Sequence, residues 1–124
     1  LPEFARNVDG YEANVGQIRL LSSASDARVR VFFGTWCSHC EQVVPRLVKL
    51  QQQLEGEGPM ITYHGVPRRI SEDPLARRLD VHAVPTAVVF RGDALDPASV
   101  VGKLSGAELD RPERALSAAL FGGG

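Results

Sequence analysis

The chain has 124 residues and a mass of 13.4 kDa, which is room for one domain with an ordinary hydrophobic core. It is 44% hydrophobic and 23% charged, and its net charge is −1, which excludes wholesale disorder and the basic surface that nucleic acids or anionic membranes require. Apolar runs such as Ala87–Phe90 are far shorter than the roughly 20 residues of a membrane-spanning helix.

The first half of the chain predicts a helix, a strand and a second helix. Apolar residues at helical spacing, from Tyr11 to Leu21, indicate an amphipathic helix over about residues 10–23. The run 28–34 is rich in β-branched and aromatic residues and predicts a strand. Valine and leucine at helical spacing over 37–54 predict a long helix, which Pro45 should bend because it removes one backbone hydrogen bond.

The second half predicts three more strands and two helices. Asp73, as a helix N-cap, and Pro74, at the first helical position, indicate a short helix through residue 79. A closing helix is expected over 108–120, and strands are expected over 60–66, 86–90 and 100–104. This order of elements predicts an α/β fold, a central mixed β-sheet flanked by helices on both faces.

One domain over residues 1–124 is expected, because no repeat or long linker divides the chain. We expect residues 1–9 and the glycine-rich end 122–124 to be loosely ordered. The sequence starts with Leu1 instead of Met, as it would after removal of a signal peptide, exclusion of a membrane anchor or simple trimming. We therefore favour an extracytoplasmic location, such as the bacterial periplasm, over a cytoplasmic one.

Two cysteines lie between the first predicted strand and the second predicted helix, in the segment Trp36-Cys37-Ser38-His39-Cys40. A sulfur at a helix start faces free backbone N–H groups and the positive end of the helix dipole, and both favour the thiolate. We therefore expect Cys37 to ionise more readily than a free cysteine and to attack disulfides. Cys40, one turn further on and more buried, would resolve the mixed disulfide.

Two neighbours of these cysteines are candidates for tuning the reaction. A charged His39 ring, or an N–H donor on it, would stabilise the Cys37 thiolate and make the disulfide a stronger oxidant. The alternative is that His39 is an exposed turn residue without influence. We interpret Trp36, the only tryptophan, as a partly exposed platform beside the sulfur, with core packing as the alternative.

Pro85 stands directly before the most apolar predicted strand. A cis Val84–Pro85 bond would turn the backbone of Val84 outward, where its N–H and C=O could pair with an extended peptide. The sequence alone does not establish a cis bond, since only about 5–6% of X–Pro bonds are cis.

The dithiol segment, Pro45 five residues after Cys40, and Val81–Thr86 occur together in this order, and with them the chain resembles the thioredoxin superfamily of thiol–disulfide oxidoreductases. The resemblance covers Tyr11–Phe121. It implies a thioredoxin-like fold and protein-disulfide oxidoreductase activity, with Pro85 cis and packed against the dithiol. It also implies a shallow substrate groove lined by Trp36, Ala83, Val84, Thr86 and Gly102.

The resemblance further implies that the partners are protein thiols and disulfides, and that a separate redox partner regenerates the dithiol. The redox-active Cys37–Cys40 pair would need no bound cofactor, because its dithiol form carries the two electrons itself, and we expect a monomer. The context Gly34-Thr35-Trp36-Cys37 is similar to reductive extracytoplasmic members of the superfamily. His39 instead resembles the histidine of periplasmic oxidants and protein disulfide isomerases, so the direction of electron flow stays open.

One position departs from the family pattern. Many members carry a buried acid on the strand before the active site, and Val31 stands at that place here. A valine cannot accept a proton from Cys40, so the resolving thiol needs another route to deprotonation. We interpret His64, on the strand predicted over 60–66, as a structural or surface residue.

Two other functions compete with the redox interpretation. Cys37, Cys40, His39 and His82 offer soft metal ligands, but a structural zinc site usually has a second compact ligand pair, which this sequence lacks. A noncatalytic binding module could keep the fold for protein recognition, but such modules can lose a cysteine and this chain retains both. We therefore favour an enzyme that exchanges disulfides.

Overall fold

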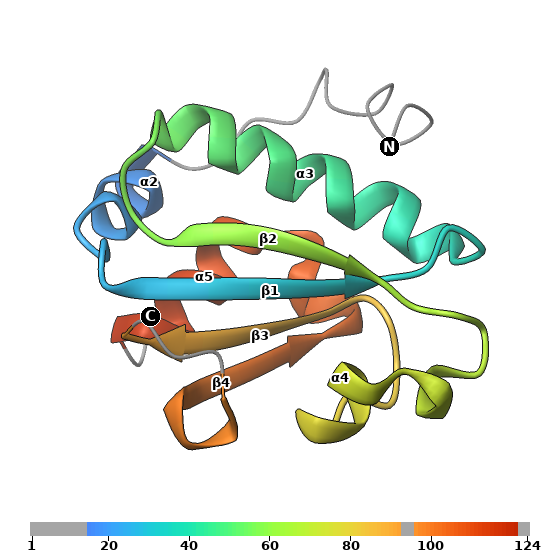
Figure 1. Ribbon diagram of the computed structural model, residues 1–124. Helices are drawn as coiled ribbons and strands as arrows, with labels where there is room; N and C mark the ends of the chain where they lie inside the picture. Colours follow the sequence, from blue (N-terminus) through green and yellow to red (C-terminus); the bar gives the residue numbers. More distant parts are fainter. Residues whose placement is uncertain (1–14, 93–95, 122–124) are drawn as a thin grey trace.

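The computed structural model describes residues 15–92 and 96–121. Its four strands form one mixed sheet in the order β2-β1-β3-β4 (Figure 1). β1 (Ala27–Phe33) pairs parallel with β2 (Met60–Gly65) and antiparallel with β3 (Thr86–Arg91). β3 also pairs antiparallel with β4 (Val100–Ser105). The two strands richest in buried residues are therefore the two central ones, as their apolar sequences require.

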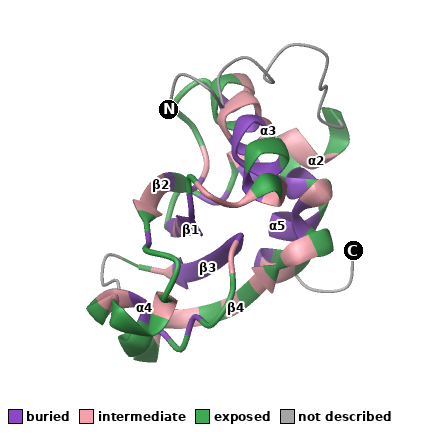
Figure 2. Ribbon diagram, turned by 90° about the vertical axis from the view of Figure 1, so that its right-hand side faces the viewer, coloured by how far each residue is buried: buried purple, intermediate pink, exposed green. Residues whose placement is uncertain are grey.

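Helices lie on both faces of this sheet. α2 (Val15–Ser22), α3 (Ser38–Leu54) and α5 (Pro112–Phe121) contact one another over one face. The short helix α4 (Pro74–Arg78) and the 3₁₀ turn η1 (Ile70–Glu72) lie on the other side of the sheet (Figure 2). The predicted α/β architecture is thus confirmed.

Alternate residues of the central strands supply two separate cores. Val29 and Val31 of β1 face the larger core, beneath α2, α3 and α5. Phe32 of β1 and Phe90 of β3 face the smaller core, which includes Ala76 of α4. This division follows from the two-residue period of a strand, which sends successive side chains to opposite faces.

The closing helix differs from its prediction. The segment expected to be one helix over 108–120 is divided into the 3₁₀ turn η3 (Gly106–Asp110) and α5, which starts at Pro112. Ser105 and Glu108 form a capping box that belongs to η3, and the Glu108 carboxylate accepts the Ser105 N–H at 3.0 Å. Because Pro112 has no N–H, it begins a new helix more easily than it continues an old one.

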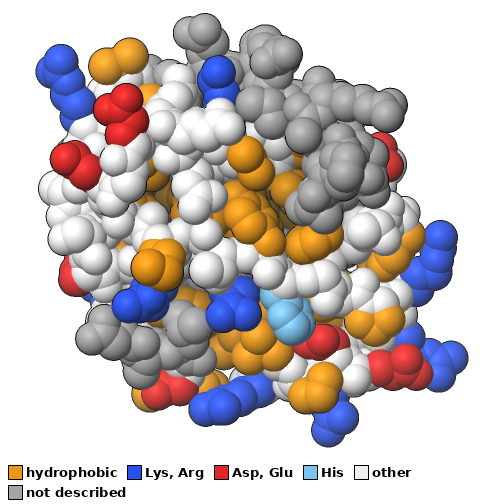
Figure 3. All heavy atoms as spheres, turned by 45° about the horizontal axis from the view of Figure 1, so that its top comes forward, with side chains coloured by type: hydrophobic (Ala, Val, Ile, Leu, Met, Phe, Trp, Pro, Cys, Tyr) orange, Lys and Arg blue, Asp and Glu red, His pale blue; other side chains and the backbone are white. Residues whose placement is uncertain are grey.

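The remaining predicted elements lie within a few residues of their expected bounds. Pro45 is inside α3, as predicted, and is buried. The first helix is described from Val15 onward, and residues 1–9, 10–14 and 122–124 lie outside the described part. Within residues 15–92 and 96–121, no helix has both the length and the apolar character to cross a bilayer. Acidic and basic side chains are both scattered over the face shown in Figure 3.

Candidate active site

Cys37 is the N-cap of α3. Its Sγ accepts a hydrogen bond from the Cys40 N–H at 3.2 Å, and as a thiol it donates to the Val84 carbonyl oxygen at 3.8 Å. The turn that delivers it from β1 is closed by the Cys37 N–H, which donates to the Gly34 carbonyl at 3.1 Å. The sulfur is partly exposed. It therefore lies where the sequence predicts, with a backbone N–H directed at the atom that would carry negative charge.

Cys40 has the opposite environment. It is fully buried in a small apolar cluster with Phe33 and Val44. Burial, and then the hydrogen bond to Cys37, raises the pKa of Cys40 to about 12. Both cysteines are free, so one partly exposed sulfur lies over a second that stays protonated at neutral pH. Val31 is fully buried in the larger core, in the position where the family resemblance expects an acid.

Trp36 is fixed beside Cys37. Its Nε1–H donates to the Val66 carbonyl at 3.1 Å, and the ring is partly exposed at the margin of the smaller core. Gly34 makes this position available, because a Cβ at residue 34 would lie 2.4 Å from Trp36 Cε2. The Arg68 guanidinium lies over the indole, 5.6 Å from its centroid. The ring is thus both a partly exposed surface and a packed side chain.

The loop before β3 contacts the dithiol. The Val84–Pro85 peptide bond is cis, and Val84 packs against the apolar cluster that contains Cys40. Ala83 is exposed, whereas Thr86 is buried and its hydroxyl donates to the Ala83 carbonyl at 2.7 Å. Ala83 and Val84 therefore reach the surface near Cys37, whereas Pro85 is buried beneath them and Thr86 holds their loop in shape.

Gly102 is not brought to this group, in contrast to the expectation from the family resemblance. It pairs with Val89 in the sheet, whereas Ser105 pairs with Thr86 beside the active-site loop. A Cβ on Gly102 would lie 3.2 Å from the Cβ of Ala119 in α5. Gly102 faces α5 within the sheet, so its small size serves the packing of a helix and not a substrate groove.

His39 faces an acid that the sequence analysis missed. Its Nε2 lies 2.8 Å from Oδ1 of Asp110, at the end of η3, and within the described residues its ring makes no hydrogen bond to either sulfur. Arg46 donates to the backbone oxygen of the same Asp110. The other end of η3 is tied to the active-site loop, because the Gly106 N–H donates to the Pro85 carbonyl at 3.1 Å. No local sequence signal marks Asp110 as a partner of His39.

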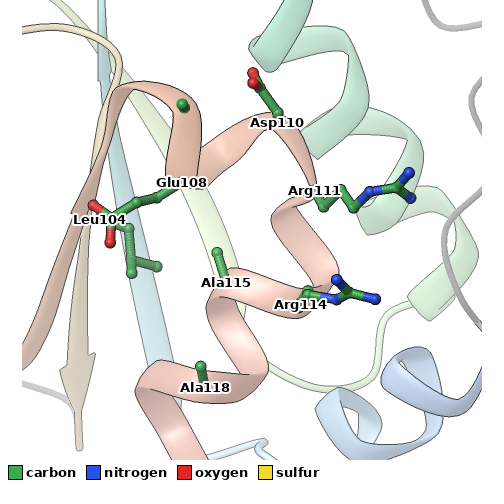
Figure 4. Close-up of a pocket in the computed structure, with 8 residues that line it drawn as sticks. Leu104, Glu108, Asp110, Arg111, Arg114, Ala115 and Ala118 are labelled. Atoms are coloured by element: carbon green, nitrogen blue, oxygen red, sulfur yellow. The ribbon is translucent and has the colours of Figure 1, made fainter. Parts of the chain in front are cut away.

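A hollow of about 430 Å³ lies beside this pair, between β4, η3 and α5 (Figure 4). Figure 4 shows Asp110 pointing toward α3, with Arg111 and Arg114 on the side of the hollow away from Leu104. Neither cysteine lines the hollow, but Asp110, the partner of His39, does. Its lining residues are Leu104, Ala107, Glu108, Asp110, Arg111, Arg114, Ala115 and Ala118.

The two other histidines face different partners. His64 lies 2.9 Å from the Asp73 carboxylate and packs edge-on against Phe32, which agrees with its interpretation as a structural residue. His82 lies 2.6 Å from Asp80. In the part of the chain that the structure describes, no three side chains among histidine, cysteine, aspartate and glutamate converge as a metal site would require.

Comparison with known proteins identifies a family that matches this chain. The sequence profile of the Thioredoxin family matches residues 12–112. Protein disulfide-isomerase A4 of Bos taurus is 37% identical over 60 residues, which is 48% of this chain but only 9% of the bovine protein. This chain therefore aligns with a small part of that relative's length.

Solved structures share the fold. Thioredoxin f2 of Chlamydomonas reinhardtii has a TM-score of 0.55 at 23% identity, with 86% of this chain and 89% of that chain covered. A Pseudomonas aeruginosa protein described as having unknown function has a TM-score of 0.65 at 17% identity, with 98% and 81% covered. The family profile matches most of the chain, and the fold and the Cys-X-X-Cys pair at a helix start agree with it. The chain therefore belongs to the thioredoxin family, whose members are thiol–disulfide oxidoreductases.

Proposed function

We propose that this protein exchanges disulfides with protein substrates, with Cys37 as the attacking sulfur and Cys40 as the resolving one. The observation that carries the proposal is the unequal environment of the two sulfurs. The Cys37 sulfur is partly exposed and accepts the Cys40 N–H at 3.2 Å, whereas Cys40 is fully buried. A reachable anion and a protected second thiol are what a two-step exchange needs.

The exchange proceeds in two balanced steps. The Cys37 thiolate attacks one sulfur of a substrate disulfide, which forms a mixed disulfide and releases the other substrate sulfur as a thiolate that takes up a proton. Cys40 then loses its proton and attacks the Cys37 sulfur, which forms the Cys37–Cys40 disulfide and releases the second substrate thiolate. The substrate gains two electrons and the protein loses two; the reverse sequence oxidises a substrate dithiol.

The substrate would bind against the loop that contains the cis Val84–Pro85 bond. Val84 contacts the dithiol cluster, and its carbonyl already faces the Cys37 sulfur at 3.8 Å. Ala83 is exposed and Trp36 is partly exposed beside Cys37. An extended peptide could therefore pair with the backbone at Val84 while its cysteine approaches Cys37.

The dithiol would act without a bound cofactor, since it holds the two electrons itself. A separate redox partner must then return it to its starting state after each turnover. An extracytoplasmic location is part of the proposal, and the similarity of Gly34-Thr35-Trp36-Cys37 to extracytoplasmic members of the superfamily supports it. We also propose a reduction potential above about −270 mV, the value typical of thioredoxin, because a stabilised Cys37 thiolate favours the reduced form.

Reduction of insulin disulfides tests the proposal. Cys37→Ser should abolish the activity, and Cys40→Ser should accumulate a mixed disulfide with insulin that mass spectrometry detects. Ser38→Ala is the matched control, because Ser38 is exposed between the two cysteines and should keep the activity. Residual reduction by Cys37→Ser, or no adduct with Cys40→Ser, would contradict the assigned roles. Equilibration of the wild type with a glutathione buffer tests the potential.

A further inference from the structure

The surface beside Cys37 carries a cation in a fixed position. Arg68 lies over the Trp36 ring, 5.6 Å from its centroid, an arrangement in which a guanidinium is attracted to the face of an indole. The ring beneath it is held by the Trp36 Nε1–H, which donates to Val66 at 3.1 Å. Pro67, between Val66 and Arg68, limits the backbone of the connecting segment. The charge therefore stands near the residue that precedes the nucleophile.

The Arg68 guanidinium has N–H groups that can donate hydrogen bonds to a ligand. Arg68 is exposed, and among residues 15–92 and 96–121 it forms no ion pair. Its neighbour Arg69 differs, because Arg69 lies 3.5 Å from Glu72. Stacking uses the face of the guanidinium and leaves the N–H groups at its edge directed outward, in the fork that matches a carboxylate.

Three other cations on this side of the molecule already have an acidic partner. His39 faces Asp110 at 2.8 Å, and His82 and Lys103 face Asp80 at 2.6 and 3.6 Å. Unlike these three, Arg68, which lies over the residue before Cys37, has no acidic partner among the described residues. A bound peptide that places a carboxylate over Trp36 would supply that acid.

We propose that Arg68, seated on Trp36, selects protein partners that carry an aspartate or glutamate within a few residues of their reactive cysteine. The inference rests on the proposed disulfide exchange and adds the chemical class of the substrate. A carboxylate at that place would pair with the Arg68 fork while the partner's cysteine reacts with Cys37. The expected signature is faster capture of acidic partners, which salt suppresses by screening the charges.

Three synthetic peptides test this selection. Each has one cysteine flanked on both sides by glutamate, glutamine or lysine, and each is oxidised to its disulfide-linked dimer. The rate constant for the reduced full chain is divided by that of dithiothreitol with the same peptide, because a flanking charge also changes the intrinsic reactivity of the disulfide. The wild type should prefer the glutamate peptide to the lysine peptide several-fold at low salt, and the ratio should approach one in 1 M NaCl.

Variants locate the preference at one side chain. Arg68→Gln should bring the ratio toward one, whereas Arg69→Gln, the matched control next to it, should keep it. Arg68→Lys keeps the charge and should retain part of the preference, which covers the case in which Arg68→Gln loosens Trp36. Emission from Trp36, the only tryptophan, reports such loosening directly.

Two outcomes overturn the proposal. The first is the same glutamate-to-lysine ratio in the wild type, Arg68→Gln and Arg68→Lys, and the second is a preference for lysine. A different result would contradict the proposed function itself: neither the three peptides nor the uncharged hydroxyethyl disulfide would oxidise the wild-type dithiol. If the protein reduces hydroxyethyl disulfide but reacts with all three peptides at the same normalised rate, disulfide exchange is supported and the selection by Arg68 is contradicted.

Discussion

The imidazole Nε2–H of His39 is directed at the Asp110 carboxylate, 2.8 Å away, and not at either sulfur. A carboxylate only accepts hydrogen bonds, so this contact assigns the proton to Nε2 and fixes the plane of the ring. η3, which ends in Asp110, begins at Gly106, whose N–H donates to the Pro85 carbonyl. One short turn thus connects the first turn of α3 to the loop that would hold the substrate.

A double-mutant cycle measures whether Asp110 acts through His39. His39→Ala should lower the reduction potential by about 30 mV or more, equal to about 1.4 kcal/mol, because a charged ring in the first turn of α3 would stabilise the Cys37 thiolate through space, without a hydrogen bond to it. Asp110→Ala should lower the potential less in the wild type and should have no effect in the His39→Ala background. Glutathione equilibration gives all four values. Additive shifts would mean that the two residues act independently.

Resolution of the mixed disulfide should depend steeply on pH. Burial, and then the hydrogen bond to Cys37, raises the pKa of Cys40 to about 12 in the free dithiol. Burial is the largest cause and does not depend on the Cys37 thiol, so Cys40 in the mixed disulfide should stay protonated at pH 7, and its ionised fraction should rise tenfold with each pH unit. Rapid quenching at pH 6 to 9, with the mixed disulfide measured by mass spectrometry, should show its decay accelerating about tenfold per unit.

The capture step provides the internal control for that experiment. Formation of the mixed disulfide uses Cys37 and not Cys40, so its rate in the same samples separates the pH dependence of capture from that of resolution. A decay rate that levels off near neutral pH would show that a base close to Cys40 takes its proton, although Val31 occupies the place of the family's acid.

Gly34 should be intolerant of any side chain. A Cβ there would lie 2.4 Å from Trp36 Cε2, closer than real Cβ contacts come, so Gly34→Ala must displace the indole. We expect a loss of about 1–3 kcal/mol of stability from overpacking, a shift in Trp36 emission and slower insulin reduction. Gly65→Ala is the control, since its Cβ would meet the Phe33 ring at an ordinary 3.6 Å. Unchanged emission in Gly34→Ala would contradict the fixed position of the ring.

The parts of the fold that the sequence predicts are those encoded locally. β1, α3 and β3 follow from runs of β-branched residues or helical spacing within a few residues of one another. Cys37 at the helix start follows from the same local pattern. The start of α5 was wrong because the choice between one helix and two depends on the capping box of Ser105 and Glu108.

The parts that the sequence misses depend on distant contacts. Asp110 lies 71 positions from His39, and no periodicity links them. The family resemblance assigned Gly102 to the substrate groove, but in the structure Gly102 packs against Ala119 of α5. The side chain of Arg68 lies over Trp36, a contact between distant positions of the chain that no sequence pattern indicates.

Asp73 should make the stability of the protein depend on pH in the acid range. It is the N-cap of α4, where it accepts the Ala76 N–H at 2.9 Å, and it also faces His64. Burial alone would raise its pKa, but the hydrogen bonds from Ala76 and His64 hold the pKa of Asp73 below its ordinary 3.8. The unfolded chain therefore binds the proton first as the pH falls. The stabilisation is complete above about pH 4 and is lost as the pH falls through the folded-state pKa.

Urea unfolding of the wild type, Asp73→Asn and Asp73→Ala between pH 2.5 and 7 checks this sign. Asn keeps an oxygen that can cap the helix but has no proton to gain, so its deficit should be largest near neutral pH and should shrink below about pH 4. Ala also loses the cap and should cost about 1 kcal/mol more than Asn at every pH. A wild-type advantage over Asn that stays constant down to pH 2.5 would mean that Asp73 acts only as a cap, because the advantage of an ionised carboxylate must vanish once both states are protonated.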